Sequence, residues 1–483
     1  MALASLPIPL LFDESYAIVP FLLLAVLSLL LGQALFRYFH EAESMRLPHA
    51  MITAALGWAV IPLLGAIPIF LIANRLAADP LVSETVLAFQ YPLNALFEAF
   101  SGYTSTGLTV ALRPSELPRS LQWWRSFMEW VGGVGVIVLM LAVLMPSDPR
   151  YLFYAEARER RIWPSISNSV RAIWWIYLAY TAVSIVALRL VGLDWWAAIN
   201  HGLTGISTGG FTITDNSIGA YPPQVQIVVI LIMTVGAISF AAHHELLRER
   251  NFHTFWEEIQ PRALLFLLVV GTLLLYFEIG RGESADEPRW LASLFQWVSA
   301  LGTCGFSTAD LGQWNTAAQL LLSGAMIIGG AAGSTAGGLK LLRVVTLVKG
   351  LYWRFRRLIS QPQEVLTYHL GDEYLTELEA SRRVESAGVL AITWVTLIGI
   401  GTLILLHIVP DTYSLSEVIF ETSSALGSVG LSTGITHPAL AWPGKVVLIL
   451  FMWMGRLEII PVLLLFASLL SVPSRYLPRR LPG

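Results

Sequence analysis

The chain has 483 residues, of which 55% are hydrophobic and only 13% charged, and its mean hydropathy is +0.65. A soluble domain carries about 25% charged residues, so the composition excludes a soluble enzyme and indicates a protein that crosses the membrane several times. The net charge of −3 carries little information, because the placement of charge matters more than its sum in a membrane protein. The single cysteine, Cys304, excludes an internal disulfide. The first 12 residues lack the basic start and the cleavage site of a signal peptide.

A helix needs about 20 apolar residues to cross the bilayer. In chain order, such stretches lie near residues 17–36, 50–73, 126–145, 170–191, 224–242, 262–279, 316–348, 385–408 and 444–471. Shorter apolar stretches lie near residues 91–106, 195–209, 290–304 and 415–429. These are too short to cross, so we expect them to be re-entrant segments.

Positive charge is concentrated on one side of this arrangement. Most of the 30 Lys and Arg residues lie in the C-terminal tail and in the connections without a short apolar stretch, with the largest group between Lys340 and Arg383. Because positively charged connections stay in the cytoplasm, we expect these connections and the C-terminus on the cytoplasmic side of the cell membrane. The short apolar stretches then enter the membrane from outside.

The four short stretches are related in sequence. They align without gaps as LFEAFSGYTSTGLTV from Leu96, INHGLTGISTGGFTI from Ile199, LFQWVSALGTCGFST from Leu294 and IFETSSALGSVGLST from Ile419. Each contains a glycine followed by Leu or Phe and then by Ser or Thr, at Gly107, Gly210, Gly305 and Gly430. A second glycine follows 25 or 26 residues later in the next span, at Gly132, Gly236, Gly330 and Gly455.

The repeated unit is therefore an outer span, a short re-entrant helix, a glycine-containing loop and an inner span, and it occurs four times. We predict an all-α polytopic membrane protein, in which four tandem repeats surround a central pore in a pseudo-fourfold arrangement and one extra span precedes them. The expected segments are 1–48 for the extra span, 49–146 for repeat 1, 147–250 for repeat 2, 251–360 for repeat 3, and 361–483 for repeat 4 with the C-terminal tail.

The repeated loops suggest how an ion is selected. Non-helical backbone persists in the bilayer core only where it is buried in protein or lines a water-filled cavity. Four such loops around one axis offer a ring of backbone carbonyls, which can replace the hydration shell of a cation. The residues expected to supply the carbonyls are Thr106, Gly107, Gly209, Gly210, Cys304, Gly305, Val429 and Gly430. No acidic residue lies at the aligned loop positions, which favours a monovalent over a divalent cation. The alternative is that the glycines only let helices pack closely.

The third inner span, 316–348, contains a candidate gate. As one helix it would measure about 50 Å, which is too long for a bilayer core of about 30 Å. Five of the ten residues 329–338 are glycines, and each costs about 1 kcal/mol relative to alanine in a helix. We therefore predict a break here and a flexible loop in the conduction path; the alternative is an intact, tilted helix that packs through its glycines. The loop residues assigned to the gate are Gly333, Ser334, Thr335, Ala336, Gly337 and Gly338.

Arg456 directly follows Gly455 and is the one basic residue well inside a span. Intramembrane charges are costly and usually face a cavity or a partner. We expect Arg456 to place a positive barrier in the pore, to bond carbonyls of the 333–338 loop and to complete the gate. The alternative is a structural ion pair with Glu458 or Glu129.

These glycine loops, together with GGAAGSTAGGLK at 329–340 and MGRLEI at 454–459, resemble the Trk/Ktr/HKT superfamily of potassium transporters, and its TrkH branch most of all, from about residue 49 to the end. The resemblance implies that the four glycines form a K⁺ filter and that the broken span gates it. It also implies a homodimer and a cytosolic nucleotide-binding regulatory subunit of the TrkA type, so that ATP, ADP or NAD acts only through that subunit and no covalent cofactor is needed.

The chain departs from the TrkH pattern at its start. Members of that branch usually have two spans before the fourfold core, whereas only 17–36 is long enough here and residues 1–12 are too few to cross. The N-terminus is then expected outside, unless residues 1–12 fold back.

Two other functions are compatible with a polytopic membrane protein. A secondary transporter of another monovalent cation or of a small solute is the alternative, although such transporters usually contain two inverted repeats. An intramembrane enzyme would need clustered catalytic residues within the spans, which the sequence lacks. Glu98 and Glu421 begin short stretches at positions aligned with His201 and Gln296, and we expect scaffold hydrogen bonds from them rather than ion ligation. We expect no metal site in the histidine-containing tract 243–258 and no nucleic-acid partner for the basic stretch 340–357.

Overall fold

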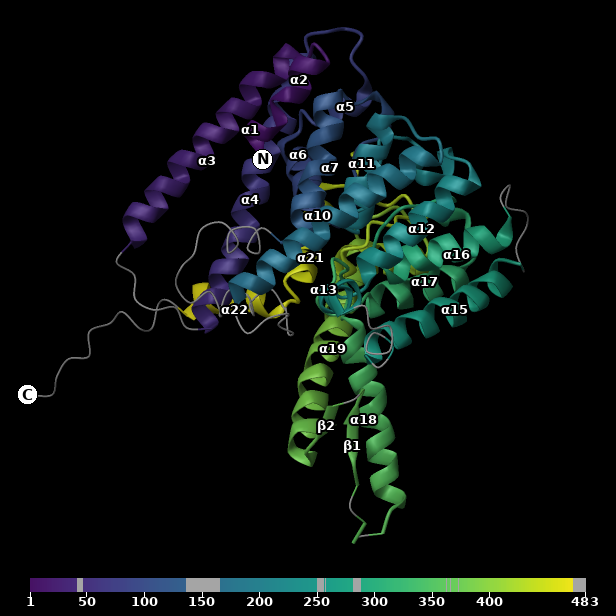
Figure 1. Cartoon of the computed structure of the whole chain (residues 1–483). Helices are drawn as coiled ribbons and strands as arrows, with labels where there is room; N and C mark the ends of the chain where they lie inside the picture. Colours follow the sequence, from purple (N-terminus) through teal and green to yellow (C-terminus); the bar gives the residue numbers. More distant parts are fainter. Residues whose placement is uncertain are drawn as a thin grey trace, which may run out of the picture.

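The structure is a computed structural model that describes residues 1–40, 47–135, 166–249, 256, 258–280, 288–361, 363–364, 366–371 and 373–471. Most of these residues are helical, and the strands among them form one antiparallel hairpin, β1 (Tyr368–Leu370) and β2 (Glu373–Leu375). Figure 1 shows most helices gathered in one body, from which α18 (Leu341–Ile359), the hairpin and the start of α19 (Glu377–Leu406) project.

The four predicted repeats are present, each with an outer helix, a short helix and an inner helix. The outer helices are α4 (Leu47–Leu76), α10 (Ile166–Leu190), α15 (Ile259–Ile279) and α19. The short helices are α6 (Pro92–Tyr103), α11 (Trp195–Ile206), α16 (Arg289–Leu301) and α20 (Leu415–Gly427). The inner helices are α7 (Arg119–Val134), α12 (Pro223–Ala237), α17 (Thr316–Ile328) and α21 (Trp442–Arg456).

Helix contacts close the four repeats into a ring. Each outer helix packs against the short helix of its own repeat, in the pairs α4–α6, α10–α11, α15–α16 and α19–α20. Each inner helix packs against the short helix of the next repeat, in the pairs α7–α11, α12–α16 and α17–α20, and α21 packs back against α6 of repeat 1. The predicted pseudo-fourfold arrangement is therefore confirmed.

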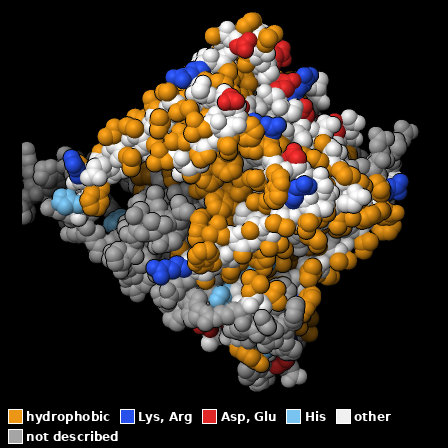
Figure 2. Space-filling model, turned by 45° about the horizontal axis from the view of Figure 1, so that its top comes forward, with side chains coloured by type: hydrophobic (Ala, Val, Ile, Leu, Met, Phe, Trp, Pro, Cys, Tyr) orange, Lys and Arg blue, Asp and Glu red, His pale blue; other side chains and the backbone are white. Residues whose placement is uncertain are grey.

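The outer surface suits a lipid environment. Among the residues that the structure describes, five helices are long and apolar enough to cross a membrane, and two bent helix pairs would raise the number to seven if each counts as one span. The five segments are Ser15–Phe39, Pro48–Leu76, Val170–Leu190, Ile259–Ile279 and Glu377–Leu406. Large apolar side chains such as Phe266 and Phe277 of α15 and Ile392 of α19 are exposed. Figure 2 shows hydrophobic side chains over most of the described surface on one face of the molecule, with few charges between them.

The inner spans differ from the prediction in one respect. Span 316–348 is broken between α17 and α18, as expected. The sequence predicts continuous helices for spans 224–242 and 444–471, and these two predictions are wrong. The chain bends by 103° between α12 and α13 (Phe240–His244), and by 115° between α21 and α22 (Ile460–Ser471). The first inner helix ends at Val134, and the rest of the predicted span 126–145 lies outside the described residues.

In repeats 1, 2 and 4 the second glycine explains where the inner helix ends. A Cβ atom placed on Gly132 would overlap the carbonyl oxygen of Tyr103, and one on Gly455 would overlap that of Leu426. A Cβ on Gly236 would lie 3.0 Å from the carbonyl oxygen of Ile206. The inner helices α7, α12 and α21 thus press their glycines against the end of the short helix of their own repeat, and each of these helices ends one or two residues beyond this contact.

The N-terminal residues fold back, as the sequence allowed. Helices α1 (Ala2–Ser5) and α2 (Pro7–Leu11) precede a 3₁₀ turn, η1 (Ser15–Ala17), and the extra span α3 (Ile18–Phe39). Helix α1 packs against both α3 and α7, and Trp123 Nε1 donates to Ser5 Oγ at 3.1 Å. The Glu14 carboxylate accepts from the backbone N–H groups of Arg119 and Ser120 at 2.7 and 2.8 Å and so caps the start of α7.

The remaining described elements are short connections. They are α5 (Glu84–Ala88), the 3₁₀ turns η2 (Pro114–Glu116), η3 (Ser217–Ala220) and η5 (Leu311–Gln313), and a π-helical turn η4 (Glu245–Glu249).

Candidate ion-conducting site

The four short helices end in the same backbone motif. The residue that terminates each one adopts a left-handed φ of 51–52°, at Ser105, Thr208, Thr303 and Ser428. In repeat 1, Ser105 N donates to Gly102 O at 3.0 Å and Thr106 N donates to Ser101 O at 2.9 Å. This is a Schellman motif, and the same pair of bonds occurs in the other three repeats. It turns the chain sharply into the glycine loops, which we define as residues 104–110, 207–213, 302–308 and 427–433.

The glycines of these loops form a closed ring. All four have positive φ, at Gly107 (88°), Gly210 (93°), Gly305 (86°) and Gly430 (97°). A Cβ atom added to one of them would overlap a carbonyl oxygen of the next loop, from Gly107 to Gly209, Gly210 to Cys304, Gly305 to Val429, and Gly430 to Thr106. The fourth loop therefore returns to the first. Glycine is required here for two reasons: the backbone φ is positive, and the carbonyl oxygen of the next loop leaves no room for a Cβ atom.

The residues before the glycines turn their side chains away from this ring. Thr106, Cys304 and Val429 have no exposed surface. Thr106 Oγ1 lies 2.7 Å from Thr104 Oγ1, and Cys304 Sγ lies 3.9 Å from the carbonyl oxygen of Gly205. At Gly209 a side chain would overlap the carboxylate of Glu129. The groups that the loops offer one another across the ring are therefore backbone carbonyls.

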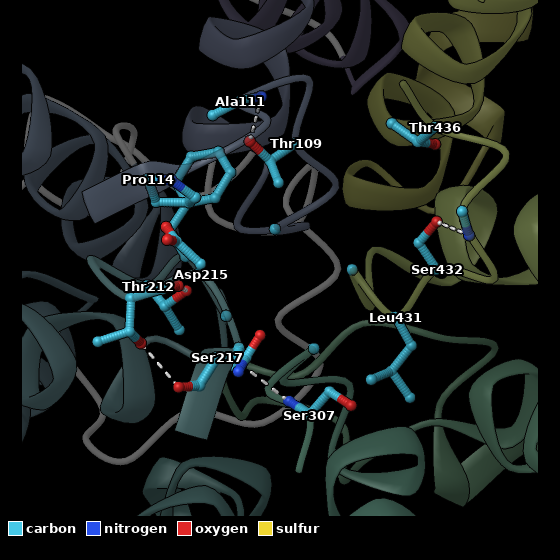
Figure 3. A pocket seen from close by; sticks show the side chains of 18 of the residues that line it. Thr109, Ala111, Pro114, Thr212, Asp215, Ser217, Ser307, Leu431, Ser432 and Thr436 are labelled. Carbon is cyan, nitrogen blue, oxygen red and sulfur yellow. Dashed lines mark hydrogen bonds between the residues drawn. The ribbon is translucent and has the colours of Figure 1, made fainter. Parts of the chain in front are cut away.

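A vestibule of about 690 Å³ opens onto one side of the ring. It is lined by all four ring glycines and by the polar residues that follow them, several of which are labelled in Figure 3. Its lining includes two carboxylates, Asp215 and Asp310. Asp215 accepts from the backbone N–H and the hydroxyl of Ser115, at 3.0 and 2.9 Å, which ties loop 207–213 to the segment before α7. Arg125 also lines the vestibule, but its charge is paired with that of Glu98. The two aspartates therefore favour the approach of a cation to the ring.

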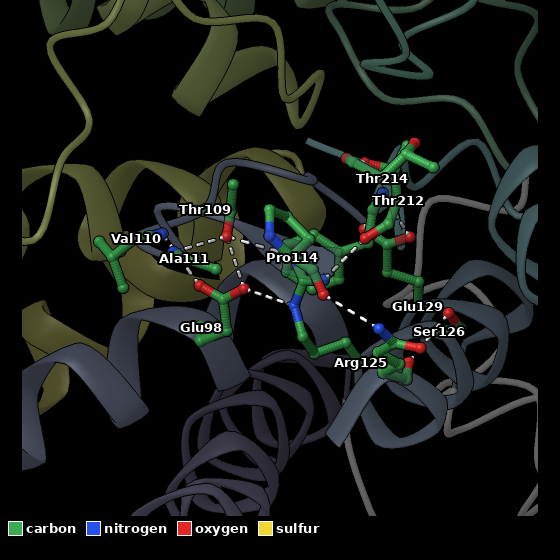
Figure 4. Close-up of polar contacts among 12 residues, drawn as sticks. Glu98, Thr109, Val110, Ala111, Pro114, Arg125, Ser126, Glu129, Thr212 and Thr214 are labelled. Carbon is green, nitrogen blue, oxygen red and sulfur yellow. Dashed lines mark hydrogen bonds and ion pairs between the residues drawn. The ribbon is translucent and has the colours of Figure 1, made fainter. Parts of the chain in front are cut away.

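A buried ion pair between α6 and α7 holds the first two glycine loops in place (Figure 4). Arg125 Nε lies 2.7 Å from Glu98 Oε1, and both side chains are at most 2% exposed. Glu98 accepts from the Thr109 hydroxyl at 2.7 Å and from Val110 N at 3.0 Å. Arg125 donates to Thr109 Oγ1 at 3.1 Å and to the carbonyl oxygen of Thr212 at 2.9 Å, across the repeat boundary. Arg125 and Glu98 thus fix the spacing of two neighbouring loops.

Glu129 of α7 also links the first two glycine loops. It is fully buried, and its carboxylate accepts from Phe211 N at 3.0 and 3.1 Å. The carbonyl oxygen of Glu129 accepts from the Ser105 hydroxyl at 2.8 Å. One residue of the first inner helix therefore holds both the first and the second glycine loop.

Three of the four aligned polar residues in the short helices bond their own glycine loop. Glu98 does so as described above, and Glu421 accepts from Ser432 Oγ at 2.9 Å and from Thr433 N at 3.2 Å. Gln296 Nε2 donates to Ser307 Oγ at 3.1 Å. In repeat 2, His201 instead lies 3.0 Å from Tyr221 OH. The expected scaffold hydrogen bonds of these positions are present.

The intramembrane loop 329–340 lies against the ends of three short helices. Thr335 Oγ1 donates to Ile206 O at 3.2 Å, Gly337 N donates to Thr303 Oγ1 at 2.6 Å, and Gly338 N donates to Gly427 O at 3.0 Å. Residues 334–339 are buried. Lys340 has a left-handed φ of 78°, and its Nζ donates to the carbonyl oxygen of Ala336. The loop therefore fills the space behind the carbonyl ring, on the side opposite the vestibule.

Arg456 joins this loop to the first repeat. Its guanidinium donates to the carbonyl oxygens of Gly132 and Gly133, the second at 2.9 Å, and to that of Thr335 at 3.2 Å. It also lies 5.4 Å from the ring centroid of Trp58. Glu458, one of the two alternative partners weighed for Arg456, forms an ion pair with Arg343 at the start of α18. The expected contact of Arg456 with the loop is present, and its role in gating stays a prediction.

Every residue predicted for the filter and the gate lies in one of these two adjacent layers. The sequence pattern assigns no role to Arg125 or Thr303, and Glu129 enters it only as an alternative partner of Arg456. Arg125 carried a usable signal, because a charged residue near the start of an apolar helix usually has a buried partner. No group of three or more His, Cys, Asp or Glu side chains suited to a metal is present within the part of the chain that the structure describes.

Comparisons with known proteins agree with this arrangement. The family model for TrkH, described as a cation transport protein, matches residues 24–475. An uncharacterized cation transporter of Methanocaldococcus jannaschii is 34% identical, over 91% of this chain and 86% of that protein. The Trk system potassium uptake protein TrkH of Vibrio parahaemolyticus is 30% identical, over 89% of this chain and 86% of that protein. The crystal structure of the potassium transporter TrkH from Vibrio parahaemolyticus superposes with a TM-score of 0.79 at 28% identity, over 96% of this chain and 94% of that one.

The match covers the glycine loops, the intramembrane loop and Arg456 in one alignment, and the fourfold architecture accompanies it. The chain belongs to the TrkH family of cation transport proteins.

Proposed function

We propose that this protein takes up potassium across the cell membrane through the ring of backbone carbonyls at Thr106, Gly107, Gly209, Gly210, Cys304, Gly305, Val429 and Gly430. The observation that carries the proposal is the closed ring, in which each glycine approaches a carbonyl oxygen of the next loop. Carbonyl oxygens without a carboxylate in the ring suit a monovalent cation. Glycine at all four positions and the potassium uptake named for the Vibrio parahaemolyticus relative favour K⁺ over Na⁺.

Uptake into proteoliposomes tests this function. We expect purified protein to accumulate tracer K⁺ down its gradient, and we expect excess external K⁺ to compete at least about tenfold better than Na⁺, which corresponds to about 1.4 kcal/mol of selectivity. Empty liposomes control for leakage. Equal competition by the two ions, or uptake no faster than in empty liposomes, would overturn the proposal.

The intramembrane loop and Arg456 are proposed as the gate of this pathway. The support is positional. The proposed gate residues are Gly333, Ser334, Thr335, Ala336, Gly337 and Gly338. Of these, Thr335, Gly337 and Gly338 are bonded to the ends of the short helices from which the glycine loops start. Residues 334–338 are buried there, and on this proposal an ion that leaves the ring would meet their backbone instead of water. Displacement of this loop would open the ion pathway from the carbonyl ring to the other side of the membrane.

The remaining assignments concern orientation and partners. A family of cation transporters is not a class of enzymes, and the Trk relatives are named as parts of a multi-component system. We propose that the C-terminus and the projecting α18 and hairpin lie in the cytoplasm, in agreement with the basic residues there. We also propose a homodimer and a cytosolic TrkA-type subunit that docks on this side and binds the nucleotide. The segments 1–48, 49–146, 147–250, 251–360 and 361–483 remain our proposed division of the chain.

A further inference from the structure

The four left-handed residues that end the short helices all carry hydroxyl groups, and their hydrogen bonds differ. The Ser105 hydroxyl donates to the carbonyl oxygen of Glu129 in the inner helix of its own repeat. The Thr208 hydroxyl donates to the carbonyl oxygen of its neighbour Ser207 at 2.7 Å. Ser428 Oγ is buried and has no partner among the described residues. Only Thr303 bonds the intramembrane loop, by accepting from Gly337 N at 2.6 Å.

This exception follows from the broken third inner helix. Helix α17 ends at Ile328, two residues before the aligned Gly330, whereas α7, α12 and α21 extend one or two residues beyond their glycines. The intramembrane loop 329–340 occupies the place that the last turn of a longer α17 would take. A Cβ on Gly337 would overlap the carbonyl oxygen of Gly427 and would lie 3.2 Å from Ser428 Cβ. Gly337 is therefore wedged between the ends of α16 and α20, with its N–H aimed at Thr303.

Thr303 is also connected to the carbonyl ring through its main chain. Its N–H donates to Ala300 O at 3.2 Å within the Schellman motif, and the next residue, Cys304, directs its carbonyl oxygen at Gly210. A β-branched residue with φ of 52° is strained, and such conformations persist only where the surroundings hold them. The hydrogen bond from Gly337 is one of the contacts that hold it.

We propose that the Thr303 hydroxyl couples the gate to the filter. When the loop is in its closed position, the N–H of Gly337 donates to the Thr303 hydroxyl. This bond fixes Thr303 and keeps the Cys304 carbonyl in the ring. When the loop leaves, this bond is lost and the third glycine loop is free to relax, so that opening the gate changes ion selectivity as well as flux. Thr303 is thus a positioning residue that acts through Cys304. The inference rests on the proposed function of the ring and the loop.

Replacement of Thr303 by valine tests the coupling, because valine keeps the shape and the β-branch but removes the acceptor. The matched control is Thr208→Val, at the same backbone position in repeat 2 with φ of 51°, where the hydroxyl bonds only its neighbour's carbonyl. Tracer K⁺ flux and the K⁺ to Na⁺ permeability ratio are measured for both variants in proteoliposomes. Thr303→Ser, which keeps the acceptor, is measured beside them.

We expect Thr303→Val to raise the flux about three- to tenfold, the range that one hydrogen bond gives to a two-state equilibrium, and to lower the permeability ratio together with it. We expect Thr208→Val to stay at least about threefold below it in flux and Thr303→Ser to restore both quantities toward wild type. A purely structural role of Thr303 would lower the yield of folded protein without this joint change.

Equal flux and equal permeability ratios in the two valine variants would overturn the coupling, and so would a rise in flux at an unchanged ratio. Should Thr303→Val fail to give monodisperse protein, the pair Thr303→Ala and Thr208→Ala makes the same comparison. Wild-type protein that does not prefer K⁺ would overturn the proposed function itself. Selective wild-type transport with indistinguishable variants would overturn the coupling alone.

Discussion

Serine in place of Gly430 is expected to lower the K⁺ over Na⁺ permeability ratio by at least about tenfold, or about 1.4 kcal/mol. Gly430 has a φ of 97°, and a Cβ atom there would overlap Thr106 O and lie 2.9 Å from Gly107 Cα. The fourth loop would have to move away from the first, which opens the ring where it closes. Bi-ionic reversal potentials or tracer competition in proteoliposomes measure the ratio, and Gly107→Ser should behave alike because it clashes with Gly209.

The control for this experiment is Gly399→Ser. Gly399 lies in the outer helix α19, is exposed, and has no atom within 4 Å of an added Cβ. It therefore reports what serine costs in a helix of this protein without a contact at the ring. Permeability ratios in Gly430→Ser that match those of Gly399→Ser would show that the glycine ring does not select the ion.

Replacement of Arg456 by alanine is expected to raise K⁺ flux at least about tenfold. The guanidinium donates to carbonyl oxygens of the first inner helix and of Thr335 in the loop. A hydrogen bond from a charged group contributes about 1.5–3 kcal/mol, so the loss of even one shifts the gate by a factor of ten or more. Deletion of residues 333–337 removes the loop itself and should also raise the flux.

Arg456→Lys separates the charge of this residue from its bonding. Lysine keeps the positive charge in the pathway but cannot reproduce the planar, forked donor set of arginine. We expect its flux to fall between wild type and Arg456→Ala if both the charge and the bonds hold the gate. Flux at or below the wild-type level in well-folded Arg456→Ala protein would contradict the gate assignment.

The fourfold fold was predictable because its sequence requirements are local. A positive φ and a close backbone approach both demand glycine, so Gly107, Gly210, Gly305 and Gly430 stand out in the alignment. The broken third span was predictable for the same reason, since its glycines make a continuous helix unfavourable.

The bends in the second and fourth inner spans could not be predicted from glycine positions in the sequence. Between α21 and α22 the left-handed residues are Glu458 and Ile459, with φ of 57° and 71°, and a β-branched residue is the least expected there. Tertiary contacts impose that conformation, among them the ion pair of Glu458 with Arg343. Pro461 offered a hint, because proline often follows a helix end.

The scaffold behind the ring depends on contacts between distant residues. Arg125 meets Thr212 only after the first two repeats have packed together. The Arg125–Glu98 and Gly337–Thr303 contacts form only when distant elements of one repeat have packed. None of these three contacts follows from spacing or periodicity, because each joins different repeats or different elements of one repeat. The sequence therefore indicates which backbone atoms face the ion but not which side chains keep them in place.

Anomalous diffraction from crystals grown in Rb⁺ or Tl⁺ would locate the bound ion directly. The carbonyl-ring account predicts a peak on the axis shared by Thr106, Gly209, Cys304 and Val429, coordinated by their backbone oxygens, and predicts that Gly430→Ser removes it. Ions bound only at the vestibule carboxylates Asp215 and Asp310, with none at the ring, would contradict the account.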